Sequence, residues 1–311
     1  MNSLAPASFG AALQAASDAA GAQHYPQGTL YIVATPIGNL ADITLRALHV
    51  LQLVDAIACE DTRHTQSLLR AYGIDAPSAR LLAVHQHNEA EAAEAVIQRL
   101  ANGERVAYVS DAGTPGVSDP GARLVAAVRA AGHRVLPLPG ASSVTTLVGA
   151  AGLVSEGEPS SAFVFAGFLP SKAGERDAAV LALAGEPRSV VLLEAPHRIE
   201  ALARALAALG DRRVTVGREL TKQFEEIATV TAASLPDWFA ESRDRTRGEF
   251  ALVLHPQAVA SGGNAEGERV LRLLLGELPL KSAVRIAAEI TGAPRNALYD
   301  AGLRMREEPS D

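Results

Sequence analysis

Residues 105–121 read RVAYVSDAGTPGVSDPG, an apolar run that passes directly into a loop of small residues. The apolar part is typical of a buried strand, and the loop contains three glycines and two prolines before the next helical pattern begins. Such a loop presents backbone N–H and C=O groups to a polar ligand, at the edge where open α/β sheets bind ligands. A tight turn without a ligand is the alternative, but the loop is longer than turning requires.

Four similar apolar runs surround this stretch and predict a sheet. They are LYIVATP at 30–36, DAIACED at 55–61, ARLLAVHQ at 79–86 and HRVLPLPG at 133–140. Ala- and Leu-rich helical patterns lie between them, at 44–53, 62–72, 89–101 and 120–131. Strands that alternate with helices indicate a mainly parallel sheet, so residues 28–153 are predicted to form a first α/β domain.

A second α/β domain is predicted over residues 160–257. GLVSEGEPSS at 152–161 is typical of a connection, and five more strand-like runs follow. These runs are AFVFAGF, SVVLLEAP, RVTVGREL, EIATVTA and GEFALVLHP. The last two follow one another closely, which favours an antiparallel or mixed sheet.

The two ends of the chain differ from this α/β pattern. Residues 1–27 are rich in Ala, Ser and Gln and contain no Lys or Arg, so we expect a disordered extension and no export signal. Residues 258–268 have the composition of a flexible linker. Residues 269–306 show helical patterns broken at GELPL and TGAPR, with a helix-turn-helix-like spacing, and predict a small helical module. A purely structural helical hairpin is the alternative.

Composition narrows the classes of function. The 311 residues carry a net charge of −7, which argues against a protein that coats nucleic acid. The segment 269–306 is the exception, with seven Lys/Arg against three Asp/Glu. No apolar run is long enough to cross a bilayer, and the single cysteine, Cys59, fits a reducing compartment, so a cytoplasmic protein without a membrane partner is expected.

Other strand ends carry candidate ligand-binding residues. VATPIGNLADIT at 33–44 and LPGASS at 138–143 are small-residue loops, for which an ordinary turn or a helix cap is the alternative. LLEAPHR at 192–198 and VGRELTKQFEE at 216–226 cluster opposite charges after apolar strands, as salt bridges also do. Neither a dinucleotide-binding glycine fingerprint nor a P-loop occurs, which makes a nicotinamide oxidoreductase the weaker reading.

Together these motifs resemble the tetrapyrrole methylase family. VATPIGNL, EDTR, SDAGTPGVSDPG, PGASS, FAGFLP, EAPHR and GRELTK are similar to its branch that methylates cytidine 2′-hydroxyls of small-subunit (16S) ribosomal RNA, over about residues 30–306. The resemblance implies two α/β domains with S-adenosylmethionine in the cleft between them, a homodimer, and the small ribosomal subunit as partner. By position, it implies cofactor contacts at Pro36, Ala112, Gly113, Thr114, Val117, Ser142, Ser143, Glu194 and Leu220. The chain has AGTP where many tetrapyrrole enzymes have Gly-Gly-Asp-Pro, which weakens a carboxylate role at Thr114 and a small-molecule substrate.

Methyl transfer to a ribose hydroxyl requires positioning and benefits from a group that accepts the hydroxyl proton. Glu60 and Asp61, at the end of the second strand, are the leading acid/base candidates. Arg63 and Lys222 are candidates for binding phosphate or orienting the hydroxyl. An ion-pair network across the cleft is the competing role for all four. The histidines show no metal-ligand spacing, so no metal is predicted.

Two other functions remain open from the residues. A methyltransferase of the same fold could act on a small molecule or a protein-bound group, which the acidic net charge favours. A ligand-sensing helix-turn-helix regulator would explain the tail, but it would leave the cleft loops without chemistry.

Overall fold

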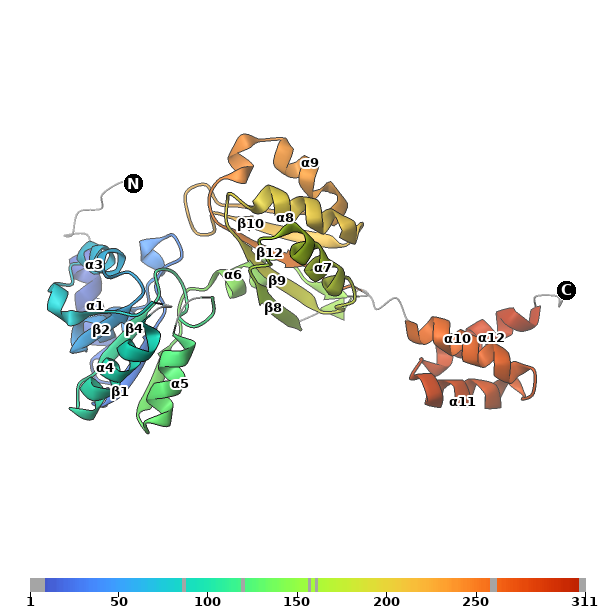
Figure 1. Ribbon diagram of the computed structural model, residues 1–311, viewed down its shortest axis with the longest axis horizontal. Coiled ribbons are helices and arrows are strands. Elements are labelled where there is room, and N and C mark those ends of the chain that lie inside the picture. Colours follow the sequence, from blue (N-terminus) through green and yellow to red (C-terminus); the bar gives the residue numbers. More distant parts are fainter. Residues whose placement is uncertain are drawn as a thin grey trace.

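Two five-stranded sheets and a separate group of helices make up the molecule (Figure 1). The computed structural model describes residues 9–85, 88–118, 121–155, 158–159, 162–257 and 262–307. Both sheets are covered by helices, which confirms the predicted α/β class with a helical module at the end of the chain. Short 3-10 helices lie at Leu40–Asp42, Ser78–Arg80, Ala207–Leu209, Ala232–Ser234 and Arg243–Thr246.

The first sheet is entirely parallel, as the alternating pattern predicts. Its order is β3-β2-β4-β1-β5, so the carboxyl ends of β2, β4, β1 and β5 lie side by side at one edge. The five predicted strands are all present: β1 Thr29–Val33, β2 Ala56–Cys59, β3 Leu81–Ala83, β4 Val106–Val109 and β5 Arg134–Leu138. The loops after these strands therefore meet at one place.

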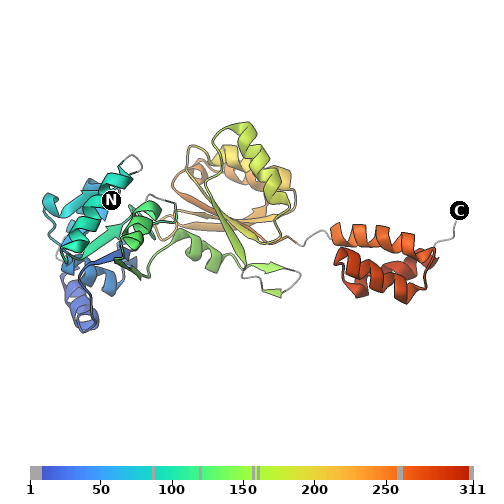
Figure 2. The ribbon, with the colours of Figure 1, turned by 60° about the horizontal axis from the view of Figure 1, so that its bottom comes forward.

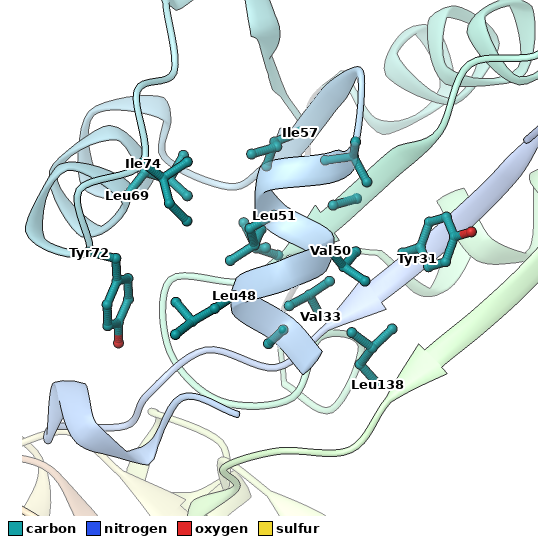
Figure 3. Packing of buried hydrophobic residues seen from close by; sticks show 14 of the residues in the cluster. Tyr31, Val33, Leu48, Val50, Leu51, Ile57, Leu69, Tyr72, Ile74 and Leu138 are labelled. Atoms are coloured by element: carbon teal, nitrogen blue, oxygen red, sulfur yellow. The ribbon is translucent and has the colours of Figure 1, made fainter. Parts of the chain in front are cut away.

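Alternate residues of the strands point to opposite faces, and each face has its own helices. Tyr31 and Val33 of β1 face α1 Gly10–Ala20, α2 Leu45–Leu53 and α3 Thr62–Ala71. Figure 3 shows Leu48, Val50 and Leu51 of α2 beside Val33 and Leu138 of the sheet. On the opposite face, Leu30 packs with α4 Glu89–Ala101 and α5 Ala122–Ala130. The result is a three-layer domain.

The prediction of a disordered extension over residues 1–27 is wrong for α1, although residues 1–8 lie outside the described residues. Ala16 and Ala20 are buried, and α1 packs along α2. The ring of Phe9 lies edge-on to Tyr72 at 5.0 Å, and Tyr25 packs on His49 at the same distance. Small alanine side chains let the two helices approach closely, and this contact is long-range, so the local composition did not reveal it.

The second sheet is mixed, with order β11-β10-β12-β9-β8. Only β8 and β9 pair in parallel, and the other neighbours are antiparallel. Its strands are β8 Phe163–Gly167, β9 Ser189–Glu194, β10 Arg213–Arg218, β11 Glu226–Thr231 and β12 Phe250–Leu254. One face is covered by α7 Ala173–Ala184, α8 Ile199–Leu206 and α9 Leu235–Ala240. The short strands β6 Val154–Ser155 and β7 Glu158–Pro159 form a hairpin in the connection between the domains.

The other face of the second sheet is covered by α6, Ser143–Ala150. The predicted bounds assign this helix to the first domain, yet Val144 and Leu147 pack against Val191 and Val253. A side chain at Gly217 of β10 would lie 2.7 Å from Leu147, so glycine permits this close approach. α6 thus connects the two domains through packing as well as through the chain.

The C-terminal module is built from α10 Gly262–Leu275, α11 Leu280–Thr291 and α12 Arg295–Glu307. It has its own core, which includes Leu271, Ala283 and Leu298, and it lies apart from both domains in Figures 1 and 2. The breaks predicted at GELPL and TGAPR are confirmed, and Gly292 ends α11 with a left-handed φ of 72°. The predicted linker over 258–268 is wrong from Gly262 onward, because α10 begins there, and residues 258–261 lie outside the described residues. Within the described parts, no helix is both long and apolar enough to span a membrane.

Candidate active site

A cavity of about 390 Å³ opens between the two domains, at the carboxyl edge of the first sheet. The loops after β2, β4 and β5 line it from one side, and the ends of β8, β9 and β10 with the start of β12 line it from the other. This volume falls in the range of small-molecule and cofactor sites. The cleft predicted between the domains is therefore present.

The loop after β4 is held rigidly by backbone bonds to the end of β1. The amides of Thr35 and Gly113 each donate to the carbonyl of the other residue at 3.0 Å. The Thr35 hydroxyl also donates to Ser110, and the Thr114 hydroxyl donates to the carbonyl of Ala141 at 3.1 Å. These hydrogen bonds fix the loop beside the cavity that its residues line.

Ser142 and Ser143 stand at the start of α6, where they line the cavity. Ser142 is in the N-cap position, but its hydroxyl makes no capping hydrogen bond among the described residues. The Ser142 side chain therefore does not act as the helix cap that was the alternative to ligand binding. The first amides of α6 have no carbonyl partner within the helix, as at any helix start, and such a terminus is suited to an anionic group.

Glu194, at the end of β9, brings a buried carboxylate to the cavity. Its Oε1 accepts from the Ala195 amide at 2.8 Å and lies 3.0 Å from Nε of Arg198, although that N–H is not aligned for a hydrogen bond. Its Oε2 has no hydrogen-bond partner among the described residues. A buried carboxylate oxygen without a partner is costly, which indicates that a ligand group supplies one.

The loop after β10 reaches from the second domain to the first. Glu219 and Thr221 have positive φ values of 51° and 67°, and Leu220 between them lines the cavity. The Asn39 amide donates to the Thr221 hydroxyl at 3.1 Å. Non-glycine residues in this conformation store strain, and such strain is often found at functional sites.

Lys222 is the next residue of this loop, does not line the cavity, and bonds two carboxylates. Its Nζ is 2.8 Å from Glu219 and 3.0 Å from Glu249, and Glu249 lines the cavity. Burial alone would lower the pKa of Lys222, but the hydrogen bonds and charges of Glu219 and Glu249 outweigh burial and raise it. Lys222 is therefore a permanent cation in an ion-pair network, which is the competing role considered from the sequence.

The residues after β2 separate into two roles. Glu60 lines the cavity, but Asp61 is the N-cap of α3 and accepts from the amides of Arg63 and His64 at 2.7 and 3.2 Å. The backbone hydrogen bonds from His64 and Arg63 lower the pKa of the Asp61 carboxyl. A carboxylate with a lowered pKa is a weaker base, so Glu60 is the better placed of the two candidates. The Arg63 side chain is exposed on the first turn of α3 and does not line the cavity.

Most of the residues proposed as cofactor contacts lie together at this cavity. They are Ala112, Gly113, Thr114, Val117, Ser142, Ser143, Glu194 and Leu220. Pro36 is buried beside Ile37, which does line the cavity. The predictions did not include Asp111, Phe168 and Glu249, which are also at the cavity wall. Of these, Asp111 lies within SDAGTPGVSDPG and could have been found there, whereas Glu249 follows only from the position of β12.

Two other kinds of chemistry find no support in this cavity. Within the described residues, no group of three His, Cys, Asp or Glu side chains could hold a metal ion. Cys59 is buried at the end of β2, and burial raises the pKa of its thiol to about 11, so it is protonated at neutral pH. The polar side chains at the cavity wall are therefore hydroxyls and carboxylates, and Ile37, Val117, Phe168 and Leu220 are among its apolar residues.

Comparison with known proteins identifies the family. Residues 29–236 match the family described as Tetrapyrrole (Corrin/Porphyrin) Methylases. The chain belongs to the tetrapyrrole methylase family. Residues 261–306 match the family described as RsmI C-terminal HTH domain. The family predicted from the motifs is confirmed, and so is a helical module at the end of the chain.

Curated relatives of this tetrapyrrole methylase cover nearly its whole length. It is 47% identical over 283 residues to Ribosomal RNA small subunit methyltransferase I of Escherichia coli O157:H7, which covers 90% of this chain and 96% of that protein. It is 48% identical over 275 residues to the protein of the same name from Xylella fastidiosa, covering 88% and 98%. The predicted branch of the family is thereby confirmed as well.

Solved structures share the two-domain fold at low sequence identity. A cobalt precorrin-4 methyltransferase aligns with a TM-score of 0.52 and 19% identity, over 74% of this chain and 98% of that one. A diphthine synthase aligns with a TM-score of 0.53 and 15% identity, over 73% and 90%. Both alignments support the fold and its two domains.

Proposed function

We propose that this chain transfers the methyl group of S-adenosylmethionine to the 2′-hydroxyl of a cytidine ribose in 16S ribosomal RNA, acting on the small ribosomal subunit in the cytoplasm as a homodimer. The observation that carries the methyl-transfer part is the cleft, where a loop of small residues of one domain faces a buried carboxylate of the other. The RNA part is supported by the names of relatives that are 47–48% identical along nearly the whole chain.

The residues of the cleft fit this cofactor. The Oε2 of Glu194 suits a hydroxyl or amino donor, and the start of α6 at Ser142 and Ser143 suits a carboxylate. Gly113 keeps the loop free of a side chain at the cavity wall, while Ile37, Val117 and Leu220 provide apolar surroundings and Pro36 is buried beside Ile37. When bound, the cofactor supplies a methyl group that its sulfonium already makes electrophilic.

The chain itself must hold the ribose hydroxyl in line and accept its proton. We assign the role of proton acceptor to the Glu60 carboxylate, because Glu60 lines the cavity and Asp61 caps a helix. Lys222 is assigned a positioning role through Glu249, and Arg63 is assigned to RNA phosphate from its exposed place on α3. Fixing the reactants in line could account for much of the rate.

The deciding experiment uses small ribosomal subunits from cells that lack this gene. They are incubated with the purified chain and labelled S-adenosylmethionine, and the labelled nucleotide is mapped. Label at a cytidine ribose is expected. Label on a protein or a small molecule would support the alternative substrate, and cofactor binding without any transfer to the subunit would contradict the RNA assignment.

A further inference from the structure

Phe168 is an aromatic side chain at the cavity wall that is 51% exposed. Large aromatic side chains are usually well buried, so a half-exposed ring inside a cleft indicates contact with a ligand. Within the described residues, no other aromatic ring is found against it. Phe168 belongs to the motif FAGFLP, which the cofactor contacts do not use.

The backbone holds Phe168 in a fixed position. Gly167 has a φ of 65°, and the pairing of β8 with β9 shifts between Phe165 and Gly167, so the chain turns out of the sheet at this point. On the other side, Leu169 is buried, and its carbonyl accepts from the Arg198 guanidinium, which also lies beside Glu194. The backbone that carries Phe168 is thus held on both sides, and Arg198 links it to Glu194 at the cavity wall.

The ring also stands where the two domains meet. A Cβ atom at Gly167 would lie 3.9 Å from the Ser118 hydroxyl, so the segment before Phe168 adjoins the end of the loop after β4. Val117 of that loop lines the cavity and is 38% exposed. The cavity opening is therefore bordered by two exposed apolar side chains, one from each domain.

We propose that Phe168 is the platform on which the target nucleobase stacks, so that its ribose is placed in the cleft. This inference rests on the proposed function and names how the same site takes its substrate. Proteins that recognise unpaired RNA bases stack them on exposed aromatic rings, and every base has a face that fits such a ring. Because the backbone on both sides of Phe168 is already held, little additional chain has to be ordered when the base binds.

The test compares Phe168→Ala, Phe168→Leu and Phe168→Trp in the full chain, with small subunits that lack the modification. Stacking is worth roughly 1–3 kcal/mol per base, so kcat/KM for the subunit should fall about 5- to 150-fold in Phe168→Ala. Phe168→Trp should stay near wild type, and Phe168→Leu should resemble Phe168→Ala. Calorimetric affinity for S-adenosylmethionine should be unchanged in all three variants.

Phe224→Ala is the matched control, because Phe224 is 69% exposed on the same domain and does not line the cavity. Equal activity of Phe168→Ala and Phe224→Ala would overturn the inference, and so would a parallel loss of cofactor affinity, which would place the ring against the cofactor. If Phe168→Ala unfolds, the comparison of kcat/KM between Phe168→Leu and Phe168→Trp decides. Equal activity of these two variants would overturn the inference, because it would show that aromatic character is not used. A wild-type chain that does not methylate the subunit contradicts the proposed function instead.

Discussion

Gly113 adopts a φ of 82° in the loop that faces the cleft, a conformation that costs other residues roughly 1–2 kcal/mol. A Cβ atom there would also lie 3.3 Å from Ile37, another residue of the cavity wall. We expect Gly113→Val to lower the affinity for S-adenosylmethionine at least about tenfold in a folded protein, as measured by calorimetry.

The matched control for this prediction is Gly116→Val. Gly116 has nearly the same φ, 81°, but no atom lies within 4 Å of its Cβ position and it does not line the cavity. Both variants should lose similar stability, and only Gly113→Val should lose cofactor affinity. Equal affinities would remove this loop from the cofactor site.

Glu60 and Asp61 are neighbours with different expected roles. Glu60→Gln keeps the size of the side chain but cannot accept a proton, so its single-turnover methylation rate should fall by about 100-fold or more. Asp61→Asn can still cap α3 and should methylate at a nearly normal rate. The opposite order of the two rates would show that Asp61, and not Glu60, accepts the proton.

The cap formed by Asp61 predicts a pH-dependent contribution to stability. The folded protein lowers the pKa of this carboxyl below its unfolded value of about 3.9. The stabilisation is therefore complete above that value and is lost as the pH falls through the folded pKa. Thermal unfolding should show a difference between wild type and Asp61→Ala at pH 7 that shrinks toward pH 3. A constant difference would contradict this account.

At the scale of elements, the start of α10 changes the charge of the C-terminal module. Residues 269–306 are basic, but the folded module spans 262–307 and includes Glu266, Glu268 and Glu307. It therefore carries seven Lys/Arg and six Asp/Glu. Within its described side chains, Arg269, Arg285 and Arg295 form ion pairs, whereas Arg272, Lys281 and Arg304 form none. RNA docking by this module would depend on the second group.

A salt series tests this division. Replacing Arg272, Lys281 and Arg304 together by Gln should reduce the slope of log affinity against log salt by about 2 if all three contact phosphate. Replacing Arg269, Arg285 and Arg295 by Gln changes the net charge equally and should reduce it less. A chain that ends at Gln257 should keep its cofactor affinity and lose most subunit methylation. Identical slopes for the two triple variants would contradict phosphate docking through the unpaired cations.

The strands were predictable from the local sequence, whereas the positions of two helices, α1 and α6, were not. A run such as RVAYV carries its own signal, because burial on both faces of a parallel sheet requires continuous apolar residues. α1 carries no such signal, since its alanines are buried only through contact with α2. The same limit applies to α6, whose partner strand, β12, comes about a hundred residues later.

At the scale of the whole molecule, the cleft depends on a contact between two loops. A Cβ atom at Gly38 would lie 2.4 Å from Cγ of Lys222 and 3.0 Å from the carbonyl of Leu220. Gly38→Ala should therefore displace the loop that carries Leu220 and weaken S-adenosylmethionine binding several-fold by calorimetry. Because Lys222→Ala removes the closer atom, the double variant should recover part of the affinity. Strictly additive losses would show that the two residues do not interact.

The candidate site was predictable to the extent that its parts follow strands. Six of the cofactor contacts assigned by resemblance follow β4 or β5, and they lie together because these two strands border β1 and end at the same edge: Ala112, Gly113, Thr114, Val117, Ser142 and Ser143. Glu194 and Leu220 belong to the second domain and reach the cavity only where the second sheet meets the first. Glu249 and Phe168 could not be placed in this way, since each depends on how the second sheet meets the first. The separation of Glu60 from Asp61 required the cap geometry of α3.

α6 also determines where the protein can be cut into two separately produced halves. A first half that ends near residue 153 would carry Val144 and Leu147 without the sheet that covers them, and a second half would expose Val191 and Val253. Both fragments would expose apolar surface and would be aggregation-prone and poorly soluble. A cut at Gly140, before the helix, leaves each apolar surface with its own cover. The gene for a two-piece enzyme should therefore be divided there, and reassembly of the pieces should restore the pocket.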